Sequence, residues 1–517
     1  MLVDVVENAN YSQTLISIMT TAGNTTTIAL FILALGILGW GYYRNRDLGK
    51  YGILSWLQSL ALMSPWLLCF GALSIGWYIN FVGILALLVI STGVYIWLGT
   101  QVRVAAEEPE VAAKLVERMV AVQARQSPQP IQVDAQTLPM LLQMPQIPDV
   151  DLNGIKEIFG IDTFFATETI PYQMGAIFKG NLRGEAAKVH HRLTERLTTK
   201  VGDKYRLFLV PDPEDRPVVV VLPSSSDPQP ATTGQKVLSV VMLLATIATS
   251  LEAMGVFLGF DFYEHTERIS EVLPFALGIW TTLIAHELGH QILAERRHVK
   301  IGLPFFLPTG QIGSFGSITR FESLLPDRSV LFDVSFAGPA VGGLVSLVML
   351  LTGLFLSKTG GGLDFPSQFF QGSLLIGTLA KAVLGTAISE PMISIHPLVV
   401  IGWLGLTINA LNLMPAGQLD GGRIVQAIYG RKVAQRATLV TLVILGFIAF
   451  FNPANLVILY WLVLVGFLQR ALERPSLDEI TEPDDTRAVL GLLSLFLMAA
   501  IVIPFSPELA ARIGIGG

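Results

Sequence analysis

Long apolar runs separated by short polar stretches dominate the chain and predict membrane-spanning helices. About 20 apolar residues in a helix cross the roughly 30 Å hydrocarbon core of a bilayer. Residues 371–389 are also apolar, but they carry Lys381 and lie between spans, which favours a helix at the membrane interface. Together the remaining runs predict about ten crossings: residues 26–43, 52–71, 78–99, 237–260, 271–297, 331–356, 396–414, 437–451, 455–470 and 487–504.

A more polar segment separates the third predicted span from the fourth. Its alternating and helix-periodic stretches predict a small α+β domain of moderate polarity. A Ser/Pro-rich stretch at its end predicts a flexible tether back to the membrane. In order, the segment comprises a helix at 107–126, a Pro/Gln-rich linker at 127–148, a strand at 172–182, a helix at 185–200, strands within 205–222 and the tether at 224–234.

The composition supports a membrane protein and argues against disulfide bonds, thiolate metal clusters and a nucleic-acid partner. Hydrophobic residues make up 52% of the 517 residues and charged residues 14%, and the mean hydropathy is +0.58. Soluble domains are nearer a quarter charged. A net charge of -6 gives no reason to expect a nucleic-acid partner. The single cysteine, Cys69, excludes an internal disulfide and a thiolate metal cluster. The acidic start of the chain lacks signal or transit-peptide character and predicts an uncleaved N-terminus.

The stretch HELGH, at residues 286–290, lies inside one of the apolar runs. Positions i and i+4 share one face of a helix, so His286 and His290 can bind one metal ion. Glu287 beside them can act as a general base. The pattern can arise by chance, but two histidines and a glutamate inside a span need internal partners, which favours a metal site.

Asp420 is the candidate for the third protein ligand. It follows the span at 396–414 in the stretch NLMPAGQLDGG, which Pro415 and Gly417 interrupt. His290 lies six residues before Arg296, so the site is about 9 Å inside the basic end of its helix. Asp420 follows a span that ends at the same face. Two alternatives for its carboxylate are a helix-end cap and a salt bridge to Arg423.

Lys/Arg clusters predict the orientation of the chain in the membrane. With about ten crossings, the four clusters fall on one side, which we assign to the cytoplasm. Both termini then face outward, and the small domain is cytoplasmic. The clusters are Arg44, Arg46 and Lys50; Arg296, Arg297 and Lys300; Arg423, Arg431, Lys432 and Arg436; and Arg470 and Arg474.

HELGH followed by NLMPAGQLDG resembles the site-2 protease family of intramembrane zinc metalloproteases, over roughly residues 237–470. IGSFGSI at 312–318 is similar to the family's membrane re-entrant β-hairpin. TFFAT at 163–167 and GNLRG at 180–184 resemble the EGY-like branch found in photosynthetic organisms. Some members of that branch have lost the zinc motif, whereas this chain keeps it. A tight β-turn in the small domain is the alternative for GNLRG.

The resemblance implies a zinc metalloendopeptidase that cleaves transmembrane protein substrates in the lipid bilayer near its cytoplasmic face. His286, His290 and Asp420 would bind one Zn²⁺ per chain, and Glu287 would be the catalytic base. Asn412 matches an asparagine thought to orient substrate or stabilise the oxyanion. The implied location is multi-pass, in a bacterial-type plasma or thylakoid membrane. The alternatives are a silent scaffold or chaperone with a structural zinc, and an ion transporter.

The predicted fold is a polytopic α-helical membrane protein with a zinc-protease helical core, a re-entrant β-hairpin and a small α+β soluble domain between spans three and four. Its regions are a three-span part at 1–102, a cytoplasmic α+β domain with tether at 103–235, and a protease domain at 236–517 that ends in a C-terminal span. Glu252, inside a span, is either a polar contact or a functional group. The remaining histidines lack ligand spacing and are expected to be solvated or interfacial: His190, His191, His265, His298 and His396.

Overall fold

The structure is a computed structural model with two compact units, residues 1–144 and 145–517. It describes residues 39, 41–43, 46, 49–74, 81–106, 147–172, 174–310, 312–358, 362–452, 456–468 and 471–516. The predicted helix at 107–126, nearly all of the linker at 127–148 and most of the span at 26–43 lie outside the described residues.

Two long helices form most of the described part of the first unit. They are α2 (Gly49–Ser74) and α3 (Phe81–Ala106), and they pack against each other. The Ser91 hydroxyl of α3 donates a hydrogen bond to the Ala61 carbonyl of α2. The predicted spans at 52–71 and 78–99 correspond to these helices, apart from residues 78–80, which are not described.

The second unit begins with a small α+β fold. A four-stranded antiparallel sheet, in the order β1-β2-β4-β3, packs against α7. One face of α7 is apolar at a spacing of three to four residues, so Val189, Leu193 and Leu197 are buried against the sheet. The predicted strands and helix are present, and β1 is an additional strand. The bounds are α6 (Asp149–Lys156), β1 (Phe164–Tyr172), β2 (Gly175–Leu182), α7 (Ala186–Val201), β3 (Tyr205–Pro211) and β4 (Pro217–Pro223).

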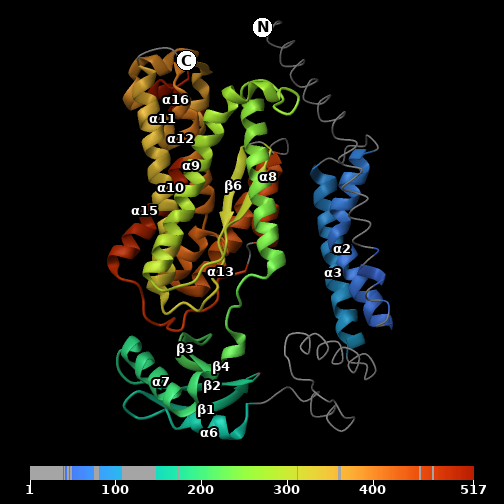
Figure 1. Ribbon diagram of the computed structural model, residues 1–517, viewed down its shortest axis with the longest axis vertical. Helices are drawn as coiled ribbons and strands as arrows, with labels where there is room; N and C mark the ends of the chain where they lie inside the picture. The colour runs from blue at the N-terminus through green and yellow to red at the C-terminus, as the bar shows by residue number, and fades with distance from the viewer. Residues whose placement is uncertain are drawn as a thin grey trace. The chain divides into compact units, whose positions relative to one another are not determined.

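A bundle of helices forms the rest of the second unit (Figure 1). Helices α9, α10 and α12 pack against one another at its centre. Among the described residues, five helices are long and apolar enough to cross a membrane: α8 (Thr233–Phe257), α9 (Ile269–Arg296) with the turn before it, α10 (Arg328–Ser357), α13 (Asp420–Phe451) and α15 (Asp485–Val502). The shorter helices are α11 (Leu374–Leu384), α12 (Pro397–Asn412), α14 (Leu456–Leu468) and α16 (Pro507–Ile513).

The fold is therefore mostly helical and of the membrane type, as predicted. The apolar stretch at 371–389 contains the 11-residue α11. At 1.5 Å per residue this helix is about 16 Å long, too short to cross a bilayer. Two strands flank this helix in the chain and pair with each other: β7 (Leu363–Pro366) precedes it, and β8 (Met392–Ile395) follows it.

An antiparallel hairpin packs among the helices. It consists of β5 (Phe305–Thr309) and β6 (Gly313–Ile318), with a bulge between Phe306 and Pro308. Figure 1 shows β6 beside α8, and β6 also contacts α9 and α12. Phe315 of β6 is fully buried and packs against Tyr460 and Trp461 of α14. The hairpin is thus part of the core.

Helix α13 is broken near its start. Gly430 has φ 78°, and the chain resumes a helix after it. The break leaves carbonyl groups at the end of the first segment without helical partners. The buried Arg328 side chain at the start of α10 donates to two of them, with its Nε 2.8 Å from Ala427 O and its Nη2 2.8 Å from Ile428 O. The first turns of α13 are thereby fixed to α10.

Residues 473–479, here called the strap, join the small α+β fold to the helical bundle. Backbone hydrogen bonds connect the strap to β3 on one side, where Leu209 N is 2.8 Å from Leu477 O and Glu479 N is 2.9 Å from Leu209 O. On the other side, Leu477 N is 2.8 Å from Leu325 O, in the segment before α10. Lys432 of α13 adds an ion pair with Asp215 at 2.8 Å.

Candidate metal centre

Helix α9 presents His286, Glu287 and His290 to the interior of the bundle. All three side chains are buried, with exposed fractions of 4%, 5% and 2%. The two imidazole rings lie one helical turn apart, with their centroids 4.8 Å from each other. Their Nε2 atoms point toward the same space and are 3.0 Å apart. The predicted i, i+4 pairing of the two histidines is therefore realised in the fold.

Each histidine uses its other ring nitrogen to contact a neighbouring helix. His286 Nδ1 is 2.8 Å from the amide oxygen of Asn409 in α12, and His290 Nδ1 is 2.7 Å from the Val334 carbonyl of α10. Both partners are hydrogen-bond acceptors, so both Nδ1 atoms are assigned as donors. Each Nε2 then carries a lone pair toward the other. Two facing lone pairs repel, unless a cation lies between them.

Asp420, the first residue of α13, completes the group. Its Oδ2 lies 3.2 Å from His286 Nε2 and 3.4 Å from His290 Nε2. The three ligand atoms all lie within 4.8 Å of one another. Ligands about 2.0–2.1 Å from a tetrahedral zinc are about 3.3 Å apart, which matches these separations. The two nitrogens and one carboxylate oxygen are also a donor set that zinc prefers, so the residues fit this metal.

Two glycines allow the helices to approach the site closely. A Cβ at Gly338 of α10 would overlap the imidazole of His290. A Cβ at Gly421, directly after Asp420, would overlap the Leu413 carbonyl at the end of α12. Gly338 thus lets α10 approach α9, and Gly421 lets the start of α13 approach the end of α12. The alternative salt bridge from Asp420 to Arg423 is not formed, because Arg423 instead pairs with Glu473 at 2.8 Å.

The hairpin holds the carboxylate of Glu287. Ser317 Oγ donates to Glu287 Oε1, and Thr319 Oγ1 lies 3.0 Å from Glu287 Oε2. Both hydroxyl-bearing residues are buried. They are two residues apart at the end of β6, so their side chains lie on the same side of the extended chain. Both carboxylate oxygens of the candidate base are thus fixed by hydrogen bonds.

Asn412 lies at the end of α12 and contacts the same hairpin. Its side chain is 1% exposed, and its Nδ2 donates to the Phe315 carbonyl of β6 at 3.1 Å. A second bond from Nδ2 reaches the Ile408 carbonyl at 3.0 Å. The structure therefore places Asn412 against β6, and its predicted role toward a substrate remains a prediction.

Three contacts in the site were not predicted from the sequence: those of Asn409, Ser317 and Thr319. Asn409 is predictable as a site residue, since a polar residue within an apolar span usually has an internal partner.

Glu252 and the stretch GNLRG, for which the sequence left alternatives open, both have contacts within the fold. Glu252 Oε2 accepts a hydrogen bond from Phe262 N at 3.2 Å, at the turn after α8. In GNLRG, Gly180 pairs with Ala166 in the sheet, and Gly184, with φ 107°, lies two residues after the end of β2.

The remaining histidines do not join a metal group among the described residues. His190 and His396 contact backbone groups, at Leu207 O and Leu398 N. His191 and His265 lie beside Glu195 and Glu267 at 3.6 and 3.2 Å. His191 and His265 are exposed, and His190 and His396 are partly buried.

Comparison with known proteins assigns the two parts of the second unit to described families. Residues 274–451 match peptidase family M50, and residues 153–230 match the EGY3 middle domain. Among curated relatives, "Probable zinc metalloprotease EGY2, chloroplastic" of Arabidopsis thaliana is 40% identical, with 68% of this chain and 64% of its own length covered. "Probable zinc metalloprotease EGY1, chloroplastic" of the same plant is 36% identical, with 74% and 77% covered. No solved structure matches significantly.

The apolar helices, the hairpin and the buried His–His–Asp group define a class of membrane-embedded metallopeptidases. Within this class, the chain belongs to peptidase family M50, and its relatives are the EGY proteins. The resemblance to the site-2 protease family and its EGY-like branch is thereby confirmed.

Proposed function

We propose that this chain is an intramembrane zinc metalloprotease that hydrolyses peptide bonds of transmembrane proteins. The observation that carries the proposal is the convergence of His286 Nε2, His290 Nε2 and Asp420 Oδ2 beside the carboxylate of Glu287. The relatives are named zinc metalloproteases, and the M50 family acts by intramembrane proteolysis. The same residues would hold one Zn²⁺ per chain.

A bound zinc would polarise the scissile carbonyl and make a water acidic enough to lose its proton near neutral pH. Glu287 would accept this proton on its carboxylate and later donate it to the nitrogen of the leaving amine. Ser317 and Thr319 would keep that carboxylate in place. Asn412 would orient the substrate or stabilise the developing oxyanion with its amide group.

The carbonyl of a scissile bond in a helix is already hydrogen-bonded, so a helical substrate must unwind before cleavage. An extended segment can pair with a strand edge, and the hairpin β5–β6 is the strand pair nearest the site. Its contacts with Glu287 and Asn412 support a role in holding the substrate. Membrane proteins in a bilayer are therefore the proposed partners.

The finer topology is part of the proposal. We infer about ten crossings, a hairpin that enters the membrane from one face, and the α+β domain at 103–235 placed between spans three and four. The flanking regions would be the three-span part at 1–102 and the protease domain at 236–517. From the basic clusters we infer that the site lies toward the cytoplasmic face of a plasma or thylakoid membrane.

A scaffold with a structural zinc is not favoured. Structural zinc sites are closed by four protein ligands, whereas the group found among the described residues has three and leaves a position open. A hydrogen-bonded acidic residue beside that position is the arrangement of a catalytic site. A transporter would be expected to bury acidic or histidine residues along several spans.

The test is cleavage of a panel of single-span substrates by detergent-purified protein, together with the Glu287→Gln variant. We expect Glu287→Gln to lower cleavage about 100-fold or more while zinc content stays the same. Glu295→Gln, an exposed acidic residue on the same helix, is the matched control and should cleave normally. Bound zinc without turnover in the wild-type protein across a broad panel would favour the scaffold instead.

A further inference from the structure

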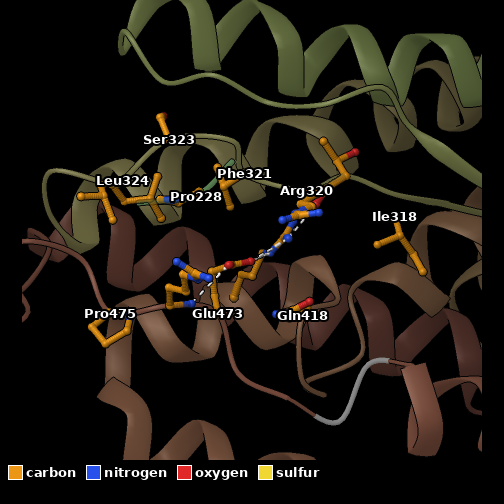
Figure 2. Close-up of a pocket in the computed structure, with 13 residues that line it drawn as sticks. Pro228, Ile318, Arg320, Phe321, Ser323, Leu324, Gln418, Glu473 and Pro475 are labelled. Atoms are coloured by element: carbon orange, nitrogen blue, oxygen red, sulfur yellow. Dashed lines mark hydrogen bonds and ion pairs between the residues drawn. The ribbon is translucent and has the colours of Figure 1, made fainter. Parts of the chain in front are cut away.

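A pocket of about 210 Å³ lies beside the metal centre, between the end of the hairpin and the strap (Figure 2). Figure 2 shows Ile318, Phe321 and Leu324 along one wall and Gln418 and Glu473 along the other. The volume exceeds the roughly 150 Å³ that accommodates a benzene molecule, so one amino-acid side chain fits. The residues that line it are Pro228, Ile318, Thr319, Arg320, Phe321, Ser323, Leu324, Leu325, Gln418, Arg423, Glu473, Arg474 and Pro475.

The pocket is continuous with the candidate catalytic residues through Thr319. The Thr319 hydroxyl contacts Glu287, and its carbonyl accepts a hydrogen bond from Arg423 Nη2 at 2.7 Å. On the opposite wall, Gln418 lies two residues before the ligand Asp420. An extended chain advances about 3.3 Å per residue. A substrate segment that leaves the site alongside residues 318–321 therefore reaches the pocket within a few residues of the scissile bond.

The charges that line the pocket have a positive excess. Three arginines face one carboxylate, that of Glu473. Arg423 is buried and neutralises Glu473 in an ion pair of 2.8 Å. Arg474 is exposed and donates to the Ser226 carbonyl at 2.9 Å, which leaves its charge uncompensated.

Arg320 is the arginine with the most freedom to bind a ligand. It is exposed, and its side chain forms no hydrogen bond or ion pair with any residue that the structure describes. The neighbouring carboxylate of Glu322 does not pair with it, and Glu322 Oε1 instead accepts a hydrogen bond from Ala231 N at 2.9 Å. A guanidinium at the edge of a partly apolar pocket suits a side chain with an apolar stem and a terminal carboxylate.

We propose that this pocket is a substrate subsite that selects an acidic residue, Asp or Glu, in the segment flanking the scissile bond, and that Arg320 is its specificity-determining residue. The inference rests on the proposed protease function and adds a preference to it. Arg423 has a different part in the subsite: it holds Thr319 and the pocket wall in place.

The first experiment compares substrates that differ by one residue. Glu, Gln or Lys is placed in turn at each of the six or so positions flanking the scissile bond on either side. We expect one position at which the wild-type protein prefers Glu over Lys by about fivefold in kcat/KM, the size of an exposed ion pair. Arg320→Glu should invert this preference at the same position. Arg192→Glu, an exposed arginine on α7, makes the same change in net charge and should leave the preference unaltered.

Equal kcat/KM values for Glu, Gln and Lys at every position would overturn the subsite. A preference for Glu that persists in Arg320→Glu would also overturn the assignment to Arg320. In both cases cleavage itself would continue, so the proposed protease function would stand. A loss of cleavage of all substrates by the wild-type protein would instead count against the protease function.

A second experiment locates the substrate without turnover. In a Glu287→Gln, Cys69→Ser background, Ser323→Cys places a single thiol in the pocket wall. We expect a disulfide crosslink to a substrate carrying cysteine next to the preferred acidic position, with at least a threefold lower yield for its Lys counterpart. Thr199→Cys, exposed on α7, is the control thiol and should not crosslink. Equal crosslinking at both thiols would contradict the subsite even where no cleavage is seen.

Discussion

At the scale of single residues, the site consists of polar side chains buried among apolar helices. Each of them has a partner from another element: Asn409 for His286, the Val334 carbonyl for His290, and the hairpin hydroxyls for Glu287. Outer partners of this kind orient metal ligands and raise their basicity. The site is therefore defined by contacts between elements as much as by the motif itself.

Asn409→Leu is expected to weaken zinc binding about 10- to 100-fold, because His286 loses the acceptor that orients its ring. Asn409→Asp keeps an acceptor oxygen and should retain most of the affinity. The measurement is zinc competition with a chelator of known affinity. Equal zinc affinity in all three proteins would show that Asn409 does not orient His286.

Ser317→Ala combined with Thr319→Val removes both hydrogen bonds to Glu287 while nearly preserving side-chain volume. We expect kcat to fall about 10- to 100-fold, because the base is no longer held in one orientation. Zinc content should be unchanged and KM nearly so. Ser317→Thr with Thr319→Ser restores two hydroxyls and should recover much of the rate. A fall in zinc content instead would indicate a structural role.

The local part of this site could be predicted from the sequence, and the distant part could not. His286, Glu287 and His290 share one helical turn, so periodicity alone relates them. Asp420 can be predicted because it follows a span of matching direction. Ser317 and Thr319 contact Glu287 from about 30 residues away, a distance over which periodicity gives no information.

Ion pairs between helix ends hold the elements around the site together. Asp333 of α10 accepts from Arg487 of α15, with Nε 2.6 Å from Oδ1 and Nη2 2.9 Å from Oδ2. Arg297, at the end of α9, pairs with the same carboxylate. One side chain thus connects three helices.

Asp333→Asn is expected to lower the free energy of unfolding by about 1–2 kcal/mol, because Arg297 loses this charged partner and Arg487 keeps only its ion pair with Asp484. The measurement is denaturant unfolding in detergent. Asp364→Asn, an exposed aspartate on β7, serves as the control and should change stability by less than about 0.5 kcal/mol. A similar loss for both variants would argue against a specific contribution of Asp333.

The helices themselves were predictable because their apolar length is a local property. The exact course of α13 was not. Its first turns, from Asp420 to the break at Gly430, are too short and polar to appear as a span, and they depend on the distant Arg328. Strand β1 is not predictable from the sequence either, because its residues 164–172 mix polar and apolar positions without a clear alternation.

For the whole molecule, the strap determines how the small α+β fold is attached to the bundle. Glu479 in the strap is 3% exposed, and its Oε2 accepts from Ser476 N at 2.7 Å. Burial raises the pKa of this carboxyl, and the nearby Arg431 and Arg328 oppose the shift only in part. A group with a raised pKa stabilises the fold below its unfolded pKa and loses that contribution as the pH rises through its folded pKa.

Glu479→Gln is therefore expected to stabilise the protein relative to wild type at pH 8 and to have little effect at pH 4.5 or below. Glutamine keeps an acceptor oxygen for Ser476 N and removes the buried charge. The measurement is the Tm of both proteins across this range. Glu482→Gln, whose carboxylate is 77% exposed, is the control. A difference in Tm between Glu479→Gln and wild type that does not change with pH would contradict the assignment.

The strap also constrains the order in which a growing chain can complete its structure. The edge of β3 is covered by residues that leave the ribosome about 270 positions later. Until then the small fold has an uncovered strand edge, a feature that invites pairing with other chains. Glu473, which pairs with Arg423 next to Asp420, is made at the same late stage. The nascent protein thus gains its docked domain and its finished site together, once the strap has been made.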